Sequence, residues 1–404
     1  MIKKDSFFKI NFTNTNNYKK NLKKTKFFFN TFLVDLKNNK IPLLESYEKS
    51  YKFDFSRKTI KKFSKYQNII IIGMGGSILG TKSIYSFLKK KIKKKVFFFD
   101  NLDLDLSLKY KKIKNLKNSC FIIAGKSGRT IETIINLSTI FSKNLFKNKL
   151  IIIAQPTDNA LMSIAEKYQA DVIEHKEFIS GRYSVLSETG MFPAALMGLN
   201  LKKFKNLEKL VKNKNFISTL IQNVATIYTL NSKGYRNSIV LNYDSNLNDL
   251  GYWYQQLVAE SLGKQGKGIN PTLSFGPKDH HSLLQLYLDG PKDKFFTFFS
   301  SSYLKKDDKL KASQDIIPNN MKFLKNKKLT FIVEAQCSAA KNIFKKKKIP
   351  FRQITFNRNN EEEIGEIFTF FALETILLSR LMSINPFDQP AVEQVKIETK
   401  KILS

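Results

Sequence analysis

Two side chains, Arg182 and Glu260, have the types and surroundings that proton-transfer chemistry needs. Arg182 lies in a polar run with glycine and serine neighbours, and Glu260 is followed at once by glycines and lysines. A carboxylate can carry a proton between two atoms, and an arginine can stabilise the negative charge that develops meanwhile. Taken singly, either side chain is more often merely solvated. The pair indicates an enzyme with an anionic intermediate.

The surrounding sequence predicts the elements that would position this pair. Short apolar runs of the kind found in buried parallel strands occur at 69–72, 96–99, 120–124, 150–154 and 172–173, and later at 239–242, 295–299, 329–333 and 351–355. Helical patterns lie between them, among them 130–141, 159–168, 250–262 and 361–384. Strands that alternate with helices predict α/β domains with parallel sheets covered on both faces.

A glycine-rich turn follows the first predicted strand. Residues 73–80 contain several glycines and Ser77, but neither the Lys-Ser/Thr end of a P-loop nor the GxGxxG spacing. Glycines allow a ligand to approach the backbone, and a helix N-terminus offers N–H groups to an anion. A tight turn without a ligand explains this motif alone equally well.

A second turn, residues 125–133, follows the strand at 120–124. Ser127 and Thr130 contribute hydroxyls, and Lys126 and Arg129 contribute cations, at another helix start. Alone, this segment could be a capped helix with solvated cations. Two such turns on one parallel sheet favour a sugar-phosphate site, because ligands bind at the carboxyl ends of parallel strands.

The composition restricts the possible partners. The formal charge of +35 suggests nucleic acid, but only seven of the 69 basic residues are arginine and the lysines are scattered. Recognition of bases and phosphates favours arginine, so most of this charge is attributed to solvated faces. Binding to a polyanion remains a weaker alternative. The charge could still attract an anionic substrate.

The remaining composition predicts a cytoplasmic protein without a membrane span. Cys120 and Cys337 are far apart in apolar contexts, which suits buried thiols in a reducing compartment. The N-terminus lacks the apolar core of a signal peptide. The longest apolar region, 367–384, is interrupted by Glu374 and Arg380, which predicts a buried helix.

Two further segments contain candidate groups. His280 and His281 are adjacent, and because side chains of neighbouring helical residues diverge by roughly 100°, they are a poor metal chelate. One could face a pocket while the other faces solvent. Lys396 lies on a terminal helix that we expect to dock on the body of the protein.

Together these segments resemble the phosphoglucose isomerase family over roughly residues 68–396. The resemblance rests on five separated motifs in the right order. It implies two sugar-isomerase (SIS) domains, each a three-layer αβα sandwich, with helical N- and C-terminal segments. The corresponding predicted parts are a helical N-terminal segment 1–67, a first SIS domain 68–200, a helical linker 201–235, a second SIS domain 236–384 and a C-terminal helix 385–404.

The resemblance also implies residue roles, taken motif by motif. The implied catalytic residues are Glu260 as base, His281 for ring opening, Lys396 and Arg182; the implied substrate- or phosphate-binding residues are Gly76, Ser77, Lys126, Ser127, Thr130 and Gln256. Gly125 stands where the family usually has serine, Arg129 where it usually has threonine, and Ser180 where it usually has glycine. One phosphate hydroxyl is therefore absent at position 125.

The implied reaction interconverts glucose 6-phosphate and fructose 6-phosphate, a step of glycolysis and gluconeogenesis, through ring opening and a cis-enediol. Members of the family act as homodimers, with the ring-opening histidine supplied by the partner subunit, and use no metal or organic cofactor. Three alternatives remain: an isomerase that also accepts mannose 6-phosphate, a non-catalytic SIS-type sugar-phosphate sensor, and a lysine-rich nucleic-acid-binding protein.

Overall fold

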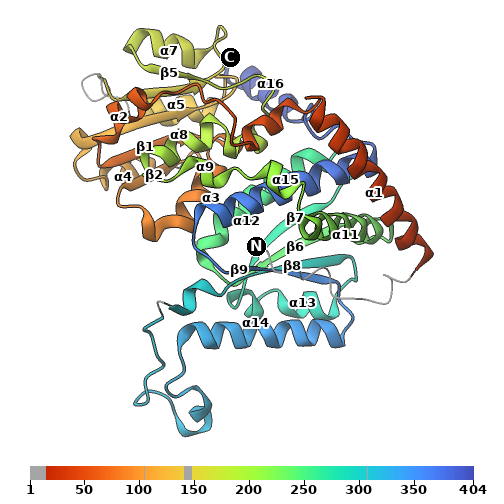
Figure 1. Ribbon diagram of the computed structural model, residues 1–404. Helices are drawn as coiled ribbons and strands as arrows, with labels where there is room; N and C mark the ends of the chain where they lie inside the picture. The colour runs from red at the N-terminus through yellow and green to blue at the C-terminus, as the bar shows by residue number, and fades with distance from the viewer. Residues whose placement is uncertain (1–14, 104, 141–147, 307) are drawn as a thin grey trace. The chain divides into compact units, whose positions relative to one another are not determined.

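The computed structural model describes residues 15–103, 105–140, 148–306 and 308–404. The chain forms two compact units, each with its own parallel sheet (Figure 1). The five-stranded unit comprises Leu33–Leu210, Asn360–Ala372 and Phe387–Ser404, and the four-stranded unit comprises the described part of Met1–Phe32 together with Val211–Asn359 and Leu373–Pro386. Two long helices, α1 (Asn16–Lys37) and α15 (Glu361–Met382), contain residues of both units.

The five-stranded unit is built on a parallel sheet with the strand order β2-β1-β3-β4-β5. Its strands are β1 (Asn68–Gly73), β2 (Lys95–Phe99), β3 (Ser119–Ala124), β4 (Leu150–Ala154) and β5 (Asp171–Glu174). All residues of β1, β3 and β4 are buried. Their uninterrupted isoleucine-rich sequences fit this position, because both faces of a central parallel strand lie under helices.

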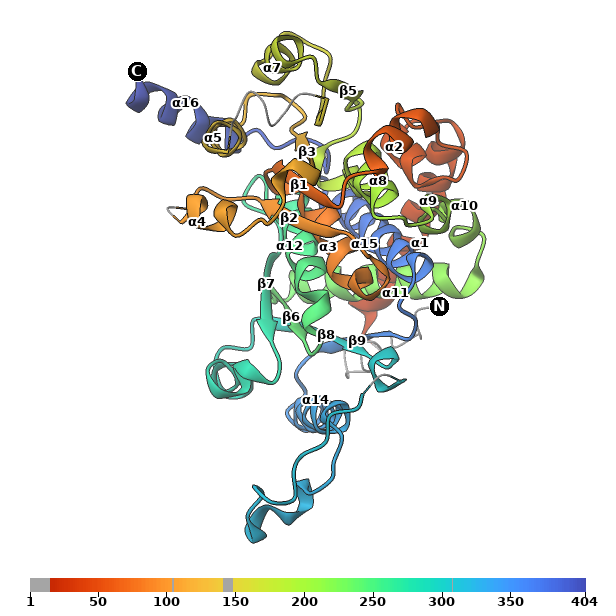
Figure 2. The same cartoon turned by 90° about the vertical axis from the view of Figure 1, so that its left-hand side faces the viewer.

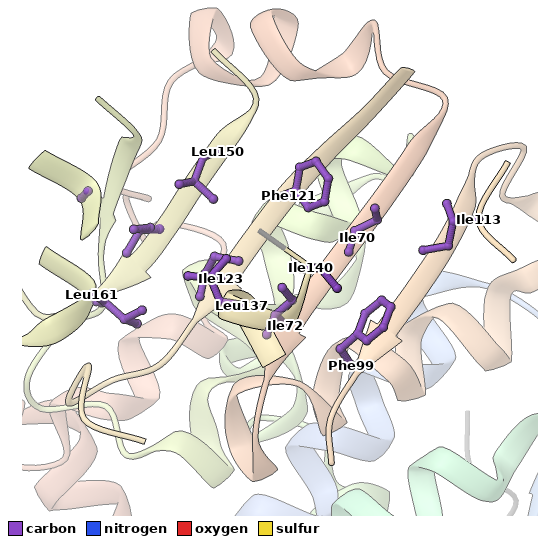
Figure 3. Packing of buried hydrophobic residues seen from close by; sticks show 13 residues of the cluster. Ile70, Ile72, Phe99, Ile113, Phe121, Ile123, Leu137, Ile140, Leu150 and Leu161 are labelled. Atoms are coloured by element: carbon purple, nitrogen blue, oxygen red, sulfur yellow. The ribbon is translucent and has the colours of Figure 1, made fainter. Parts of the chain in front are cut away.

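One face of this sheet forms a hydrophobic core, shown in Figure 3. Ile70, Ile72, Phe121 and Ile123 of the central strands pack with side chains of α5 (Ile131–Thr139) and α7 (Ala160–Tyr168). Each fully buried isoleucine of this kind contributes roughly 1.5–3 kcal/mol. Figure 2 shows α4 and α5 on one side of the sheet and α3 and α8 on the other.

The remaining elements of this unit are mostly short. They are η2 (Pro42–Tyr47), α2 (Arg57–Ser64), η3 (Gly75–Ser77), α3 (Leu79–Leu88), η4 (Lys89–Lys91), α4 (Leu106–Lys111), η5 (Leu116–Asn118), η6 (Gly181–Leu186), α8 (Glu188–Leu196), α9 (Leu201–Phe204), α10 (Leu207–Leu210) and α16 (Val392–Leu403). Helix α2 begins at a capping box, in which the Ser56 side chain accepts from the Thr59 N–H and the Thr59 hydroxyl accepts from the Ser56 N–H.

The four-stranded unit has the strand order β7-β6-β8-β9, again all parallel. Its strands are β6 (Asn237–Asn242), β7 (Asn270–Phe275), β8 (Lys294–Ser301) and β9 (Phe351–Phe356). Figure 1 shows α11 (Lys214–Ser232) and α12 (Asn248–Leu262) on one side of this sheet, with α13 (Leu284–Asp289) and α14 (Leu329–Lys346) on the other. The described part of this unit also contains the short 3₁₀ helices η7 (Ser245–Leu247), η8 (Lys278–His281), η9 (Tyr303–Lys306) and η10 (Asn319–Leu324).

Aromatic rings fill the core between this sheet and α14. Phe344 of α14 contacts Phe296, Phe298 and Phe351 edge-on, with ring centroids 4.8, 5.4 and 6.3 Å apart. Edge-to-face contacts of this kind are favoured over face-to-face stacks because the ring edge is positive and the ring face negative. The phenylalanine-rich sequence of β8 therefore holds α14 in place.

The predicted α/β fold class is confirmed: the chain has two units with parallel sheets, and helices lie near both ends. The five domain boundaries predicted from the sequence remain predictions. Residues 1–14 of the predicted N-terminal segment, and position 141 of a predicted helix, lie outside the described residues. None of the helices in the described part combines the length and apolar character of a membrane span.

Two local predictions are wrong. The run at 329–333 is the start of helix α14 and not a strand. Its pattern continues as helical spacing, because Val333, Cys337, Ala340 and Phe344 all pack against the sheet. Helix α16 does not dock on the body: its residues are exposed except for half-buried Thr399.

Candidate active site

The first glycine turn lies against the arginine loop at the carboxyl edge of the five-stranded sheet. A Cβ on Gly76 would lie 2.1 Å from the Gly181 carbonyl carbon and 2.5 Å from the Arg182 nitrogen, so only glycine fits. The Ser184 hydroxyl donates to the Gly181 carbonyl at 2.7 Å and reaches the Gly76 carbonyl at 3.3 Å. Ser77 is buried beside this contact. The two motifs, about 100 residues apart in the sequence, thus form one structure.

Arg182 is a buried cation with partners from a distant segment. Its side chain is 1% exposed, and its guanidinium donates to Gln389 Oε1 and, at 3.0 Å, to the Asp388 carbonyl. A buried charge is tolerated only when hydrogen bonds replace its water. Sequence reasoning missed this role of residues 388 and 389. The available signal was the Gln389 side-chain amide, which lies in a turn bounded by prolines just before the helix of Lys396.

The second turn adds a second cation to the same edge. Lys126 Nζ donates to the Glu177 carbonyl at 2.6 Å. Burial lowers the pKa of Lys126; Glu177 opposes this and the charge of Arg182 adds to it. Lys126 follows β3, and Arg182 lies against the turn that follows the neighbouring strand β1, so both cations belong to the same edge of the sheet. Such a region favours an anionic ligand.

The hydroxyls of the second turn are placed by its backbone. Gly128 has φ +63°, and a Cβ there would lie 1.8 Å from Asn159 Oδ1, so this position also requires glycine. Ser127 is exposed, and half-buried Thr130 is the N-cap residue of α5 without a side-chain capping bond. Both residues therefore lie at the start of α5, where the first N–H groups of the helix are found.

Gly125 differs from these glycines. Its φ is not positive, and within the described part of the chain a Cβ there would meet only Leu161 Cδ1, at 3.2 Å. The far end of a leucine side chain can move by a few tenths of an ångström. The position can therefore accommodate a serine, and its glycine is not required by the fold.

The candidate base lies on α12 of the four-stranded unit. Gln256 and Glu260 are both half-buried, and Gln256 Nε2 donates to Glu260 Oε1 at 2.9 Å. Trp253, Leu257 and Ser261, on another face of the same helix, are buried. The helix therefore keeps this face inside and directs the carboxylate to its half-buried side.

The basic turn after α12 is attached to residues near the end of α15. Lys264 Nζ donates to the Asn385 carbonyl, and Lys267 Nζ donates to the Met382 carbonyl at 3.0 Å. Lysines can hydrogen-bond the last carbonyls of a helix in this way. The two bonds fix the segment that follows Glu260.

His281 and Lys396 are the two exposed candidates. His281 is exposed on η8, while neighbouring His280 is half-buried, as their divergence predicts. Lys396 lies on α16 and its Nζ bonds Glu393 Oε1 at 2.6 Å, one helical turn away. Among the described residues, no group of three or more His, Cys, Asp or Glu side chains is arranged to hold a metal ion.

The predicted site residues thus fall into two sets, one in each unit. Gly76, Ser77, Lys126 and Arg182 lie together at the carboxyl edge of the five-stranded sheet. Gln256 and Glu260 form a hydrogen-bonded pair in the four-stranded unit. The hydroxyl- and glycine-lined edge is suited to phosphate, and the oriented carboxylate is suited to proton transfer.

The sequence of this chain is similar to those of known proteins. The phosphoglucose isomerase family pattern matches residues 47–277. The glucose-6-phosphate isomerase of Methanocaldococcus jannaschii is 33% identical over 353 residues, which are 85% of this chain and 86% of that relative.

Two crystal structures share the fold. A hypothetical protein from Thermus thermophilus has a TM-score of 0.80 and 20% identity, and the match covers 100% of both chains. A glucose-6-phosphate isomerase from Chlamydia trachomatis has a TM-score of 0.69 and 18% identity over 86% of this chain and 71% of that one.

The two parallel-sheet units and the similarity in sequence described above define an α/β isomerase of the SIS-domain class. The family match covers more than half of the chain and agrees with the relative described above. The chain belongs to the phosphoglucose isomerase family.

Proposed function

We propose that this isomerase interconverts glucose 6-phosphate and fructose 6-phosphate through ring opening and a cis-enediol intermediate. The observation that carries the proposal is the hydrogen bond from Gln256 to Glu260, which orients a carboxylate on a rigid helix. A positioned base of this kind is what proton transfer between adjacent carbons requires. The identity to the Methanocaldococcus jannaschii enzyme supports the choice of substrate.

Phosphate binding is assigned to the five-stranded unit. Ser77, Ser127 and Thr130 supply hydroxyls, Gly76 allows close backbone approach, and Lys126 supplies charge. Because the phosphate does not react, its binding energy serves to position the reacting end of the sugar.

Ring opening is assigned to His281 and Lys396. The sugar arrives as a closed ring, so one proton must reach the ring oxygen and another must leave O1 or O2. Imidazole and ammonium groups can exchange protons with these oxygens. A further part of the proposal is that His281 of one subunit serves the active site of the other subunit in a homodimer. The exposure of His281 supports this part.

Isomerisation proper is assigned to Glu260 and Arg182. Glu260 takes the proton from C2 of the open-chain aldose and returns it to C1, and the reverse direction uses the same steps. The intermediate carries developing negative charge on its oxygens. Arg182, which Gln389 and Asp388 hold in place, stabilises that charge.

Location and further substrates also belong to the proposal. Cys120 and Cys337 are free and buried, which suits a reducing cytoplasm and a place in glycolysis or gluconeogenesis. Activity on mannose 6-phosphate would require proton return to the other face of C2. Rates measured with the two aldoses separate a specific enzyme from one that accepts both.

The test is turnover of fructose 6-phosphate in deuterated water, followed by NMR of the product. Proton transfer through an enediol introduces deuterium at C2 of glucose 6-phosphate, whereas direct hydride transfer introduces none. A repeat with chelator tests the metal-free expectation. Binding of the sugar phosphate without any turnover would contradict the proposal and favour a sensor. DNA retention without sugar-phosphate binding would favour the nucleic-acid alternative.

A further inference from the structure

The turn that contains His281 is attached to strand β7 through Asp279. Asp279 Oδ2 accepts from the Phe275 N–H at 2.7 Å and from the Ser274 hydroxyl at 2.8 Å, and Oδ1 accepts from the Ser282 hydroxyl at 3.2 Å. Burial raises the pKa of Asp279, but these hydrogen bonds outweigh it and hold that pKa below its usual value. The charged carboxylate therefore links both ends of η8 to the end of the strand.

A second attachment joins His280 to Tyr243, which follows β6. The Tyr243 hydroxyl and His280 Nε2 are 2.5 Å apart, and the two rings meet edge-on with centroids 5.6 Å apart. Tyr243 is itself fixed, because its ring stacks on Phe298 at an interplanar angle of 10°. A Cβ on Gly276 would lie 2.5 Å from that ring, so the chain before η8 also packs against it.

The protonation states favour a lasting Tyr243–His280 bond. Burial raises the pKa of Tyr243 well above its usual value, so it keeps its hydroxyl proton. Burial lowers the pKa of His280, His281 lowers it further, and Asp279 opposes both. A neutral imidazole and a protonated phenol form one hydrogen bond in either tautomer.

Inward attachment of His280 fixes the direction of the next side chain. His280 is half-buried on Tyr243 while His281 is exposed, and the residues on both sides of His281 are bonded. We propose that Tyr243 and His280 are positioning residues, which hold η8 so that His281 is presented for ring opening. This inference rests on the proposed function, and neither residue is assigned contact with the substrate.

The first experiment compares two substrates. Fructose 6-phosphate closes into a furanose ring through its C5 hydroxyl, whereas 5-deoxyfructose 6-phosphate lacks that hydroxyl and stays open. Tyr243→Phe and His280→Phe keep the rings and remove the hydrogen bond. We expect kcat for fructose 6-phosphate to fall roughly tenfold with little change in KM, because small misplacement of a catalytic group is costly. Turnover of the open-chain substrate should stay unchanged.

Three variants calibrate this result. His281→Ala removes the imidazole itself, so it should give the largest difference between the kcat loss on fructose 6-phosphate and the kcat loss on the open-chain substrate. His280→Gln restores a polar side chain opposite Tyr243 and should recover most of the kcat. Lys278→Ala removes an exposed side chain of the same turn and should behave like the wild type. Thermal unfolding of each variant shows whether it is folded.

The second experiment reads the position of His281 without turnover. The chain has only three histidines, so its imidazole NMR signals can be assigned by substitution. Tyr243→Phe should increase the ring mobility of His281. Buried His175, whose pKa burial lowers to about 4, serves as the internal reference that should not change.

The outcomes separate the two hypotheses. Wild-type protein that turns over neither substrate overturns the proposed function, and the positioning role with it. Wild-type activity, with equal losses on both substrates in Tyr243→Phe, overturns the positioning role alone. Unchanged mobility of His281 in Tyr243→Phe also overturns it, whatever the rates.

Discussion

Gln256 and Glu260 are one turn apart on α12, and the amide of the first donates a 2.9 Å hydrogen bond to the carboxylate of the second. Of the two carboxylate oxygens of Glu260, this hydrogen bond involves Oε1. The spacing of four residues explains the arrangement, because such side chains are neighbours on a helix surface. The helix itself is fixed by its buried face, so the carboxylate has a defined direction.

Replacement of the carboxylate should separate binding from turnover. Glu260→Gln keeps the size of the side chain and removes its basicity. We expect kcat for fructose 6-phosphate to fall by roughly 10²–10⁴-fold, the usual contribution of general base catalysis. Calorimetric titration should show nearly unchanged affinity for the substrate. Gln256→Leu, which leaves the base unoriented, should give a smaller loss, and wild-type activity in Glu260→Gln would remove this residue from its role.

Restoring a hydroxyl at position 125 should strengthen phosphate binding. Among the described residues, a Cβ there would meet only Leu161 Cδ1, so Gly125→Ser should fold normally. A hydrogen bond to a charged group contributes roughly 1.5–3 kcal/mol. We therefore expect KM for fructose 6-phosphate to fall at least several-fold. A KM that is unchanged in Gly125→Ser would show that this position does not face the phosphate.

A neighbouring glycine provides the contrast. Gly128→Ala adds a Cβ that would collide with Asn159 Oδ1, and it does so at a positive φ. We expect this variant to unfold at a lower temperature than the wild type and to bind the sugar phosphate less tightly. The pair of variants thus distinguishes a glycine that the turn requires from one that it does not.

Much of the fold could be predicted because it depends on local sequence. β1, β3 and β4 are continuous runs of β-branched or otherwise apolar residues, and such runs indicate buried parallel strands. Strand β7 was missed because it contains Pro271 and three polar residues and lies at a sheet edge. The apolar start of α14 imitates a strand, since a run of five residues fits either structure.

The candidate site was predictable only in part. Gly76, Lys126, Arg182 and Glu260 belong to local motifs that point to a site only when they are taken together. The partners of Arg182 could not be found from spacing, because Asp388 and Gln389 are more than 200 residues away in the sequence. The attachment of His280 to Tyr243 is likewise a tertiary contact. Local patterns give residue types, whereas such contacts depend on how the chain folds.

A buried ion pair in the four-stranded unit gives a stability prediction. The Arg352 guanidinium binds both carboxylate oxygens of Glu374 and also donates to Thr297 and Asn223. Arg352→Met leaves the carboxylate buried and unpaired, which should destabilise the protein by about 3–5 kcal/mol.

The double variant tests that explanation. Arg352→Met combined with Glu374→Leu removes both charges and should recover much of the lost stability, because apolar replacement of a whole buried pair is often tolerated. Thermal unfolding of the two single variants and the double variant measures the coupling. Lys401→Ala, which breaks an exposed pair with Glu398, should change little. Additive losses in the double variant would contradict a paired role.

The buried amine of Lys205 should make the free energy of unfolding depend on pH. Its side chain is 2% exposed, and its Nζ lies 4.0 Å from the Phe53 ring centroid and 4.4 Å from that of Tyr51. Within the described residues, this Nζ has no hydrogen-bond partner. Burial lowers the pKa of Lys205 to about 7, although Glu188 and Glu48 oppose the shift. In the unfolded chain the same lysine has an ordinary pKa of about 10.4.

Between these two pKa values the unfolded chain binds one proton that the folded protein lacks. The free energy of unfolding should therefore rise with pH above about 7, while the full cost of the buried charge is present below it. Lys205→Met removes the buried charge and leaves an unbranched apolar side chain that is one atom shorter, so we expect it to be more stable at pH 6. The advantage should shrink steadily towards pH 9.5. Melting temperatures of both proteins across this range measure the difference, and two parallel curves would show that Lys205 is not a buried, weakly basic lysine.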